Sequence, residues 1–178
     1  SYHGRNLLVW AGKEPPGLAA PMIVRRVEDG FIRSRGLGAE LVPPLSLVAD
    51  DLGIYYDPSR ESRLERLLAA PLPEQARSRA ARLRARLIAA GVTKYNLAPV
   101  AFDLPPGHRI LVPGQVEDDA SIRLGAGEVR TNLDLLRATR AANPDATILW
   151  RPHPDVLAGL RPGAVSEADL AGLADATV

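Results

Sequence analysis

One stretch, residues 109–150, restricts the fold of this chain more than any other. It contains, in order, an apolar run at 110–112, a polar loop at 113–121, a helical pattern at 132–142 and a second apolar run at 147–150. Strand, loop, helix and strand in this order form the repeating unit of a parallel α/β sheet. Because such crossovers are right-handed, we expect the loops 113–121 and 151–155 to lie at the carboxyl edge of the sheet, where ligands bind.

A proline-rich segment at 98–107 precedes this unit and is typical of a linker. Before it, the apolar runs 6–10 and 21–27 predict two further buried strands. We therefore predict an α/β protein with an N-terminal half at 1–102 and the start of a second half at 108–178.

Two short apolar pieces, 43–48 and 54–56, flank an Asp-Asp-Leu-Gly turn and predict a β-hairpin. The pattern then becomes helical over 59–91, with Ser59 or Ser62 available as a cap. The side chains expected to face inward are Leu64, Leu67, Leu68, Leu83, Leu87 and Ile88. The arginines of the second helix form either a solvated surface or a contact for anionic lipid.

The composition argues against several classes of protein. A net charge of +1 and an aromatic content of 4% speak against a nucleic-acid partner. The absence of cysteine excludes disulfides and thiolate metal sites and favours a reducing cytoplasm. No signal peptide is recognisable, and no apolar run approaches the roughly 20 residues of a membrane span, so any membrane contact is expected to be peripheral. Because the sequence starts without Met and stops where an apolar pattern restarts, we expect a piece of a longer polypeptide.

Two neighbouring acids, Glu28 and Asp29, directly follow the second predicted strand and lead into Gly30. Neighbouring strand residues point to opposite faces, so one carboxylate can enter a cleft while the other orients the loop. Two nearby acids in different environments can divide the work of base or nucleophile from that of acid. The alternative is a pair of solvated acids bound to Arg33 or Arg35.

His153 stands between two prolines, which confine its backbone to extended geometry and fix the direction of its ring. Together with Arg151 it suits a phosphate, because an imidazolium donates a hydrogen bond and a guanidinium can bond two oxygens. Asp155 is placed to hold the other ring nitrogen. A structural histidine at a strand end is the alternative. We expect this loop and the acidic one to face each other across a cleft.

The loop 113–121 is suited to binding phosphate through backbone N–H groups, such as that of Gly114. Gln115 and Ser121 are candidates for hydrogen bonds to a nucleotide. The loop has neither a P-loop motif nor G-x-G-x-x-G. The consecutive acids at 117–119 lack a histidine partner and favour a charged turn or a helix cap over a metal site, so we predict no metal.

Six segments of the chain together resemble the capsule polysaccharide biosynthesis family, the KpsC or LipB type of β-Kdo transferase. In chain order, these are EDGFIRSRGLG, PPLSLVADDLGIYYDPSR, KYN, LVPGQVEDDASIRLG, TNLDLLRATRAANPDA and RPHPDVLAGLRPG. The resemblance implies a GT-B-like fold with two Rossmann-like halves, the second one truncated here. It also implies metal-independent transfer of Kdo from CMP-β-Kdo, with retention, onto a β-Kdo glycolipid of the phosphatidylglycerol type.

The acid-acid-glycine motif of this family falls on Glu28, Asp29 and Gly30, and its His-Pro motif on His153 and Pro154. CMP-dependent sialyltransferases of similar fold use such a pair of motifs. The resemblance implies that Asp29, or in second place Glu28, is the catalytic carboxylate. The residues expected to bind the CMP donor are His153, Arg151, Gln115, Gly114 and Ser121, and those expected to bind sugar carboxylates are Arg33 and Arg35.

The chain departs from the family pattern in two places. The family usually has lysine at the position of Arg151, which keeps the charge but changes its geometry. The family also continues into a glycine- and aromatic-rich segment, so we expect an incomplete donor half and a fragment that is inactive alone. The implied location is the inner face of the cytoplasmic membrane, beside other capsule-assembly proteins. The alternatives are a CMP-sialic acid transferase or nucleotide-sugar hydrolase on the same fold, and a non-catalytic module for capsule assembly.

Overall fold

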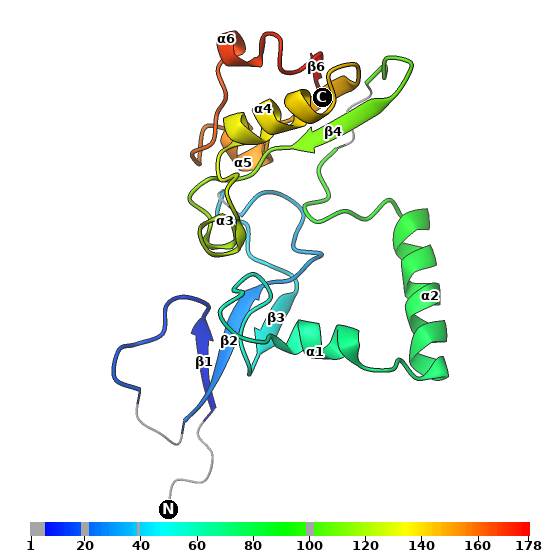
Figure 1. The fold of residues 1–178 in the computed structure, drawn as a ribbon. Helices are drawn as coiled ribbons and strands as arrows, with labels where there is room; N and C mark the ends of the chain where they lie inside the picture. The colour runs from blue at the N-terminus through cyan, green and yellow to red at the C-terminus, as the bar shows by residue number, and fades with distance from the viewer. Residues whose placement is uncertain (1–5, 19–21, 39, 99–101) are drawn as a thin grey trace, which may run out of the picture. The chain divides into compact units, whose positions relative to one another are not determined.

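The computed structural model describes residues 6–18, 22–38, 40–98 and 102–178. The chain divides into two compact units, Ser1–Leu97 (unit 1) and Ala98–Val178 (unit 2), each with a sheet of its own (Figure 1). Two predicted features lie partly outside the described residues. These are Pro21, the start of the second predicted strand, and positions 99–101 of the predicted linker.

The sheet of unit 1 has the strand order β1-β2-β3. The first two strands, β1 (Asn6–Trp10) and β2 (Ile23–Asp29), are those predicted from their apolar runs, and they pair in parallel. The third, β3 (Leu47–Asp50), is antiparallel to the end of β2 and places Asp29 opposite Leu47. Glu28 and Asp29 are therefore the last residues of the central strand.

The hairpin predicted from the pieces 43–48 and 54–56 is wrong. The carboxylate of Asp50, which is 1% exposed, accepts hydrogen bonds from the N–H groups of Leu52 and Gly53 at 2.8 and 2.9 Å. Its other oxygen accepts from the N–H of Arg63 at 2.8 Å. These bonds turn the chain into a helix after β3, where a second hairpin strand was expected.

Two helices complete unit 1, α1 (Arg63–Ala69), which Ser62 caps as predicted, and α2 (Glu74–Ala89). Their predicted inward faces are found only in part, because Leu64 and Leu87 are half-buried whereas the other four side chains are exposed: Leu67, Leu68, Leu83 and Ile88. Neither helix has a fully buried residue in the part of the chain that is described.

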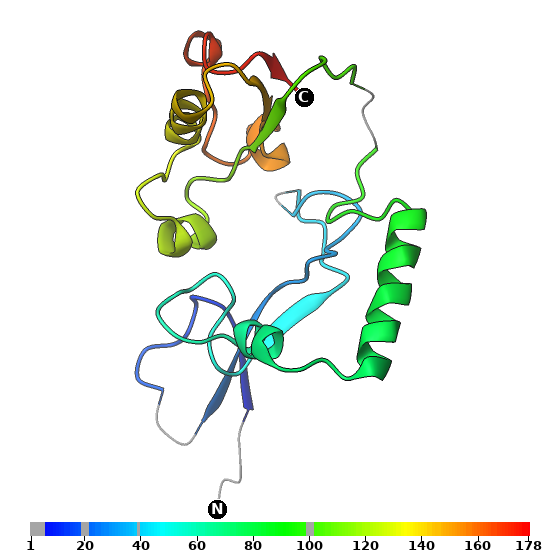
Figure 2. The same ribbon diagram turned by 45° about the vertical axis from the view of Figure 1, so that its right-hand side comes forward.

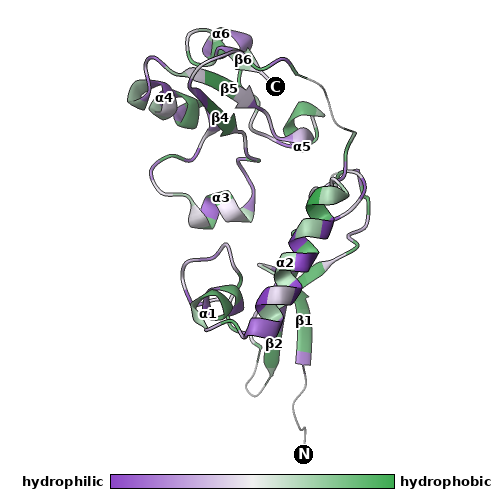
Figure 3. Ribbon diagram, turned by 90° about the vertical axis from the view of Figure 1, so that its right-hand side faces the viewer, coloured by the Kyte–Doolittle hydropathy of each residue, from purple (hydrophilic) through white to green (hydrophobic). Residues whose placement is uncertain are grey.

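Figures 1 and 2 show α2 apart from the strands of its own unit, and Figure 3 shows polar and apolar residues mixed along it. Its arginines are exposed and fall on two opposite sides of the helix, Arg77 and Arg84 on one and Arg79, Arg82 and Arg86 on the other. This distribution favours a solvated surface over a single lipid-binding face.

In unit 2, β4 (Arg109–Pro113), β5 (Thr147–Arg151) and β6 (Ala176–Thr177) form a parallel sheet in that order. The predicted crossover helix is α4 (Asn132–Ala142). It buries Leu136 against Val112, Ile148 and Trp150, and these four side chains form the core. The predicted parallel unit and the α/β class are thereby confirmed. Three short helices were not predicted: α3 (Ala120–Gly125), α5 (Pro154–Leu157) and α6 (Glu167–Leu170).

Across the described ranges, no helix combines the length and the apolar character that a membrane crossing needs.

Asp175 joins the crossover helix to the sheet of unit 2. Its carboxylate accepts hydrogen bonds from the N–H of Ile148 at 2.7 Å and from the guanidinium of Arg140 at 2.6 Å. The bond from Ile148, followed by that from Arg140, holds the pKa of Asp175 below its usual value. The stabilising charge is therefore fully present above the unfolded-state pKa, and it is lost as the pH falls through the lower folded-state pKa.

We expect Asp175→Asn to lower the free energy of unfolding of unit 2 by about 1 kcal/mol at pH 7, because half of the side chain is exposed and the ion pair is weakened by water. The deficit should shrink below about pH 4, where the wild-type carboxylate also loses its charge. Hydrogen exchange of unit 2 amides in the whole chain, followed against pH, measures both effects. The control is Asp145→Asn, at an exposed carboxylate; equal protection in the two variants at pH 7 would contradict the expectation.

Candidate functional site

The acid loop, residues 28–38, begins at the end of β2 and turns sharply after Asp29. The N–H of Gly30 donates to the carbonyl of Ser46 at 2.8 Å. A Cβ atom at position 30 would lie 2.1 Å from Oγ of Ser46, so the turn requires glycine. The acid-acid-glycine pattern thus has a structural reason, since the glycine lets the chain leave the strand directly behind the carboxylates.

Residues 94–96 hold the far part of the acid loop. The carbonyl of Lys94 accepts from the N–H of Arg33 at 2.8 Å, and that of Tyr95 accepts from the N–H of Gly36 at 2.9 Å. Nδ2 of Asn96 donates to the carbonyl of Ser34 at 2.8 Å. The KYN string had no predicted role, and the structure shows that it fixes the backbone of the acid loop.

Asp29 forms an ion pair with Arg33, whose Nε donates to Oδ2 of the carboxylate. Oδ1 of Asp29 is buried and accepts no hydrogen bond from the described residues. The side chain of Asp29 is 25% exposed and that of Arg33 is 9% exposed. The alternative in which a loop arginine binds the acids is therefore confirmed for Asp29, but the pair is mostly enclosed, where solvated acids were expected.

Glu28 bonds within unit 1 through both of its oxygens. Oε1 accepts from the N–H of Asp29 at 3.0 Å, and Oε2 accepts from the hydroxyl of Tyr56 at 3.4 Å. The ring of Tyr56 meets the edge of Tyr55 at 5.3 Å between centroids, and Tyr55 lies 5.2 Å from Phe31. Glu28 therefore links the start of the acid loop to an aromatic cluster.

The two loop arginines have different settings. Arg33 is 7% exposed, whereas Arg35 is exposed on the same loop. A sugar carboxylate arriving from solvent would meet Arg35 more readily than Arg33.

In unit 2, Gly114 packs against the core of the sheet. Its N–H donates to the carbonyl of Arg151 at 2.7 Å, and a Cβ atom there would lie 2.6 Å from Cη2 of Trp150. The next N–H, that of Gln115, donates to Oδ1 of Asn132 at 2.8 Å. The N–H groups of Gly114 and Gln115 therefore already have protein partners in this structure, and the predicted phosphate cradle would have to use other N–H groups of the loop.

The side chains of the 113–121 loop are differently placed. Gln115 is exposed, and its amide donates to the carbonyl of Pro113 at 3.3 Å. The hydroxyl of Ser121 donates to Asp119 at 2.6 Å, and Asp119 caps α3. Of the two alternatives for residues 117–119, a charged turn or a helix cap, the structure therefore has a cap at Asp119. Among the described residues, no group of three or more histidine or acidic side chains is arranged to hold a metal ion.

Asn132, the first residue of α4, fastens this loop and was missed by sequence analysis. It is 3% exposed, and its Nδ2 donates to the carbonyls of Gln115 and Gly163 at 2.8 and 2.7 Å. A Cβ atom on Gly163 would lie 2.8 Å from the same nitrogen, so glycine makes room for the contact. The bonds span 17 and 31 residues, and no local pattern indicates them.

His153 has the predicted extended backbone, with φ −64° and ψ 137°, and caps α5. Its Nδ1 accepts from the N–H of Asp155 at 3.1 Å, so the ring nitrogen that can donate in this geometry is Nε2. One detail of the prediction is thereby corrected: the backbone N–H of Asp155 holds a ring nitrogen where its carboxylate was expected to do so.

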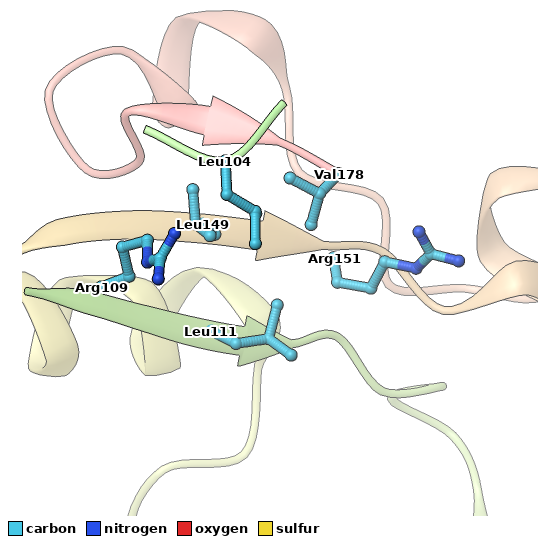
Figure 4. A pocket seen from close by; sticks show the side chains of 6 residues that line it. All are labelled: Leu104, Arg109, Leu111, Leu149, Arg151 and Val178. Atoms are coloured by element: carbon cyan, nitrogen blue, oxygen red, sulfur yellow. The ribbon is translucent and has the colours of Figure 1, made fainter. Parts of the chain in front are cut away.

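Arg151 is the last residue of β5 and is exposed. With Leu104, Arg109, Leu111, Leu149 and Val178 it lines a cavity of about 410 Å³ in unit 2. Figure 4 shows its side chain extending past the end of β5, away from the leucines. Gly114, Arg151 and His153 therefore lie at the carboxyl edge of the sheet, where the sequence placed them. The cleft shared with the acid loop stays a prediction.

Comparison with known proteins places this geometry in context. The model of a family described as "Capsule polysaccharide biosynthesis protein" matches residues 18–103 and 105–173. The capsule polysaccharide modification protein LipA of Neisseria meningitidis serogroup B is 50% identical over 155 residues, which cover 85% of this chain and 22% of LipA. The lipopolysaccharide-processing protein LpsZ of Rhizobium meliloti is 48% identical over 160 residues, which cover 83% of this chain and 35% of LpsZ.

Two solved structures of KpsC from Thermosulfurimonas dismutans are also similar. The β-Kdo 2,7 transferase has a TM-score of 0.72 and 37% identity, over 97% of this chain and 52% of that one. The β-Kdo 2,4 transferase has a TM-score of 0.70 and 34% identity, over 83% and 49%. The resemblance drawn from the six segments is thereby confirmed, and the chain spans about half the length of these structures.

Proposed function

Because this chain belongs to the capsule polysaccharide biosynthesis family, of the KpsC/LipB type, we propose that it is part of a retaining glycosyltransferase that moves Kdo from CMP-β-Kdo. The acceptor is a β-Kdo glycolipid of the phosphatidylglycerol type, and the product is the linker of a capsular polysaccharide. The observation that carries this proposal is the enclosed Asp29 carboxylate at the end of β2, in a chain that is similar to two Kdo transferases.

The proposed reaction has two displacements, because retention requires an even number of inversions. Asp29 attacks the anomeric carbon, the bond from that carbon to the phosphate oxygen breaks, and CMP leaves with the electron pair. The acceptor hydroxyl then displaces Asp29, and its proton passes to Glu28. No metal ion takes part in this scheme, and the fold that it requires is GT-B-like, with two Rossmann-like halves.

In the proposed mechanism, residues of unit 2 stabilise the departing CMP. The Nε2–H of His153 donates to a phosphate oxygen, and Arg151 supplies positive charge at the same sheet edge. Gln115 and Ser121 contact the nucleotide through their side chains, and Gly114 keeps their loop against the sheet. In this scheme the lipid acceptor brings the protein to the inner face of the cytoplasmic membrane, beside other capsule-assembly proteins.

Donor competition in the complete transferase that contains this chain tests the proposed function. CMP-Kdo should support transfer to a β-Kdo acceptor with the anomeric configuration retained, and CMP-sialic acid in excess should compete poorly. Preferential transfer from CMP-sialic acid would favour the alternative transferase. Release of free sugar without transfer would favour a hydrolase.

Two substitutions of His153 separate its structural role from its ligand-binding role. Asparagine is a good helix N-cap, so His153→Asn keeps the cap of α5, whereas His153→Ala removes it and costs about 1 kcal/mol of stability. Both variants should bind CMP about tenfold more weakly or worse, because each loses the donor at Nε2. Thermal protection by CMP measures this affinity. Failure of CMP to protect the complete protein thermally, together with unaltered transfer after His153→Ala, would favour a non-catalytic module.

A further inference from the structure

Arg33 is bound on several sides by unit 1. Its Nε donates to Oδ2 of Asp29, and its Nη1 donates to the carbonyl of Val42 at 2.8 Å and to Oγ of Ser34 at 3.0 Å. A guanidinium is planar and its donors point in fixed directions, so bonds to three partners allow it one orientation. Burial to 7% exposure excludes most competing water.

Gly38 closes the other side of this guanidinium. A Cβ atom added at position 38 would lie 2.8 Å from both Cζ and Nη2 of Arg33. The backbone of the acid loop thus lies directly against the guanidinium, and glycine is the residue that leaves room for it.

The carboxylate of Asp29 depends on this arrangement. Of its two oxygens, Oδ2 is held by Arg33, and Oδ1 is buried with no hydrogen-bond partner in the described part of the chain. A mostly enclosed carboxylate with one unsatisfied oxygen keeps its direction only while its ion-pair partner stays in place. About a quarter of the side chain is exposed, although Oδ1 itself is buried.

We propose that Arg33 is a positioning residue that fixes the Asp29 carboxylate in the orientation needed for attack on the anomeric carbon. This role rests on the proposed function and replaces the expectation that Arg33 binds a sugar carboxylate. Its Nε and Nη1 groups already donate hydrogen bonds to the protein, so Arg33 acts on the reaction through Asp29. Arg35, exposed on the same loop, keeps the sugar-binding role.

The test is steady-state kinetics of Kdo transfer by the complete transferase with three variants. Arg33→Gln should lower kcat about 100-fold and leave the donor KM within about twofold, since misplacement of a reacting group affects the transition state. Arg33→Lys restores the positive charge but not the planar guanidinium with its several fixed donors. Its kcat should be about tenfold higher than that of Arg33→Gln. Gly38→Ala keeps every charge but pushes the guanidinium aside, and should lower kcat about tenfold.

Two further variants provide the contrast. Arg35→Gln should raise the KM of donor or acceptor while kcat is retained. Arg66→Gln removes an exposed arginine paired with Glu61 and should change neither constant.

The proposal is overturned if Arg33→Gln raises KM at unchanged kcat, as a sugar-binding residue would, or if Gly38→Ala has wild-type kcat. If Arg33→Gln does not fold, the kcat of Gly38→Ala tests the proposal instead. A wild-type protein that transfers no Kdo refutes the proposed function itself, which keeps the two failures distinguishable.

Discussion

Asp29→Asn in the complete transferase is expected to lower kcat for Kdo transfer by at least about 10³-fold, because an amide cannot form the bond to the anomeric carbon. The substitution preserves size and the oxygen that accepts from Arg33, so the acid loop should keep its shape. Affinity for CMP should stay within about twofold, since the nucleotide contacts are assigned to unit 2. Kinetics of transfer and thermal protection by CMP measure the two effects separately.

Two matched variants accompany this experiment. Asp51→Asn removes a carboxylate of unit 1 that pairs with Arg63 outside the acid loop, and it should leave kcat unchanged. Glu28→Gln keeps an acceptor for Tyr56 but removes the base for the acceptor proton, and it should lower kcat by about 10²-fold. A wild-type kcat in Asp29→Asn would remove Asp29 from the mechanism.

Asn132→Ala is expected to have the largest effect on stability, about 2–4 kcal/mol in the free energy of unfolding of unit 2. The truncation leaves the N–H and carbonyl of Gln115 and the carbonyl of Gly163 without their side-chain partner in a buried setting. Because the same bonds hold the 113–121 loop, CMP affinity should fall as well. Hydrogen exchange of unit 2 and thermal protection by CMP measure the two consequences.

Asn143→Ala is the control for this variant. Asn143 is half-buried at the end of the same helix, and its side chain donates one bond, to the carbonyl of Thr139 at 3.0 Å. Its truncation should cost about 1 kcal/mol or less and leave CMP binding intact. Equal destabilisation by the two alanines would show that Asn132 has no special role.

The parts of the fold that follow from local pattern were predicted well. The apolar runs of β1, β4 and β5 and the helical repeat of α4 gave these elements close to their observed bounds. The hairpin prediction failed because the three hydrogen bonds accepted by Asp50 override the strand propensity of 54–56. Four of the six side chains expected to face inward on α1 and α2 are exposed, because an apolar stripe indicates a preference for burial but not whether another described element covers it.

The candidate site was predicted in part for a similar reason. Asp29 and His153 are recognisable because each follows or ends an apolar run and is beside glycine or proline, and Glu28 precedes Asp29 directly. The pairing of an acid with Arg33, four residues along the chain, was one of the two alternatives that the sequence offered, but the burial of this pair was not predicted. The contacts of Asn132 depend on how distant segments pack, and no local pattern indicates them.

Mass spectrometry of the complete transferase, quenched in acid during turnover with CMP-Kdo and digested, tests most directly whether Asp29 is the nucleophile of a double displacement. We predict that a Kdo adduct is found on the peptide that contains Asp29, and that the adduct is missing in Asp29→Asn. An adduct on another residue, or retained transfer by Asp29→Asn, would contradict this assignment.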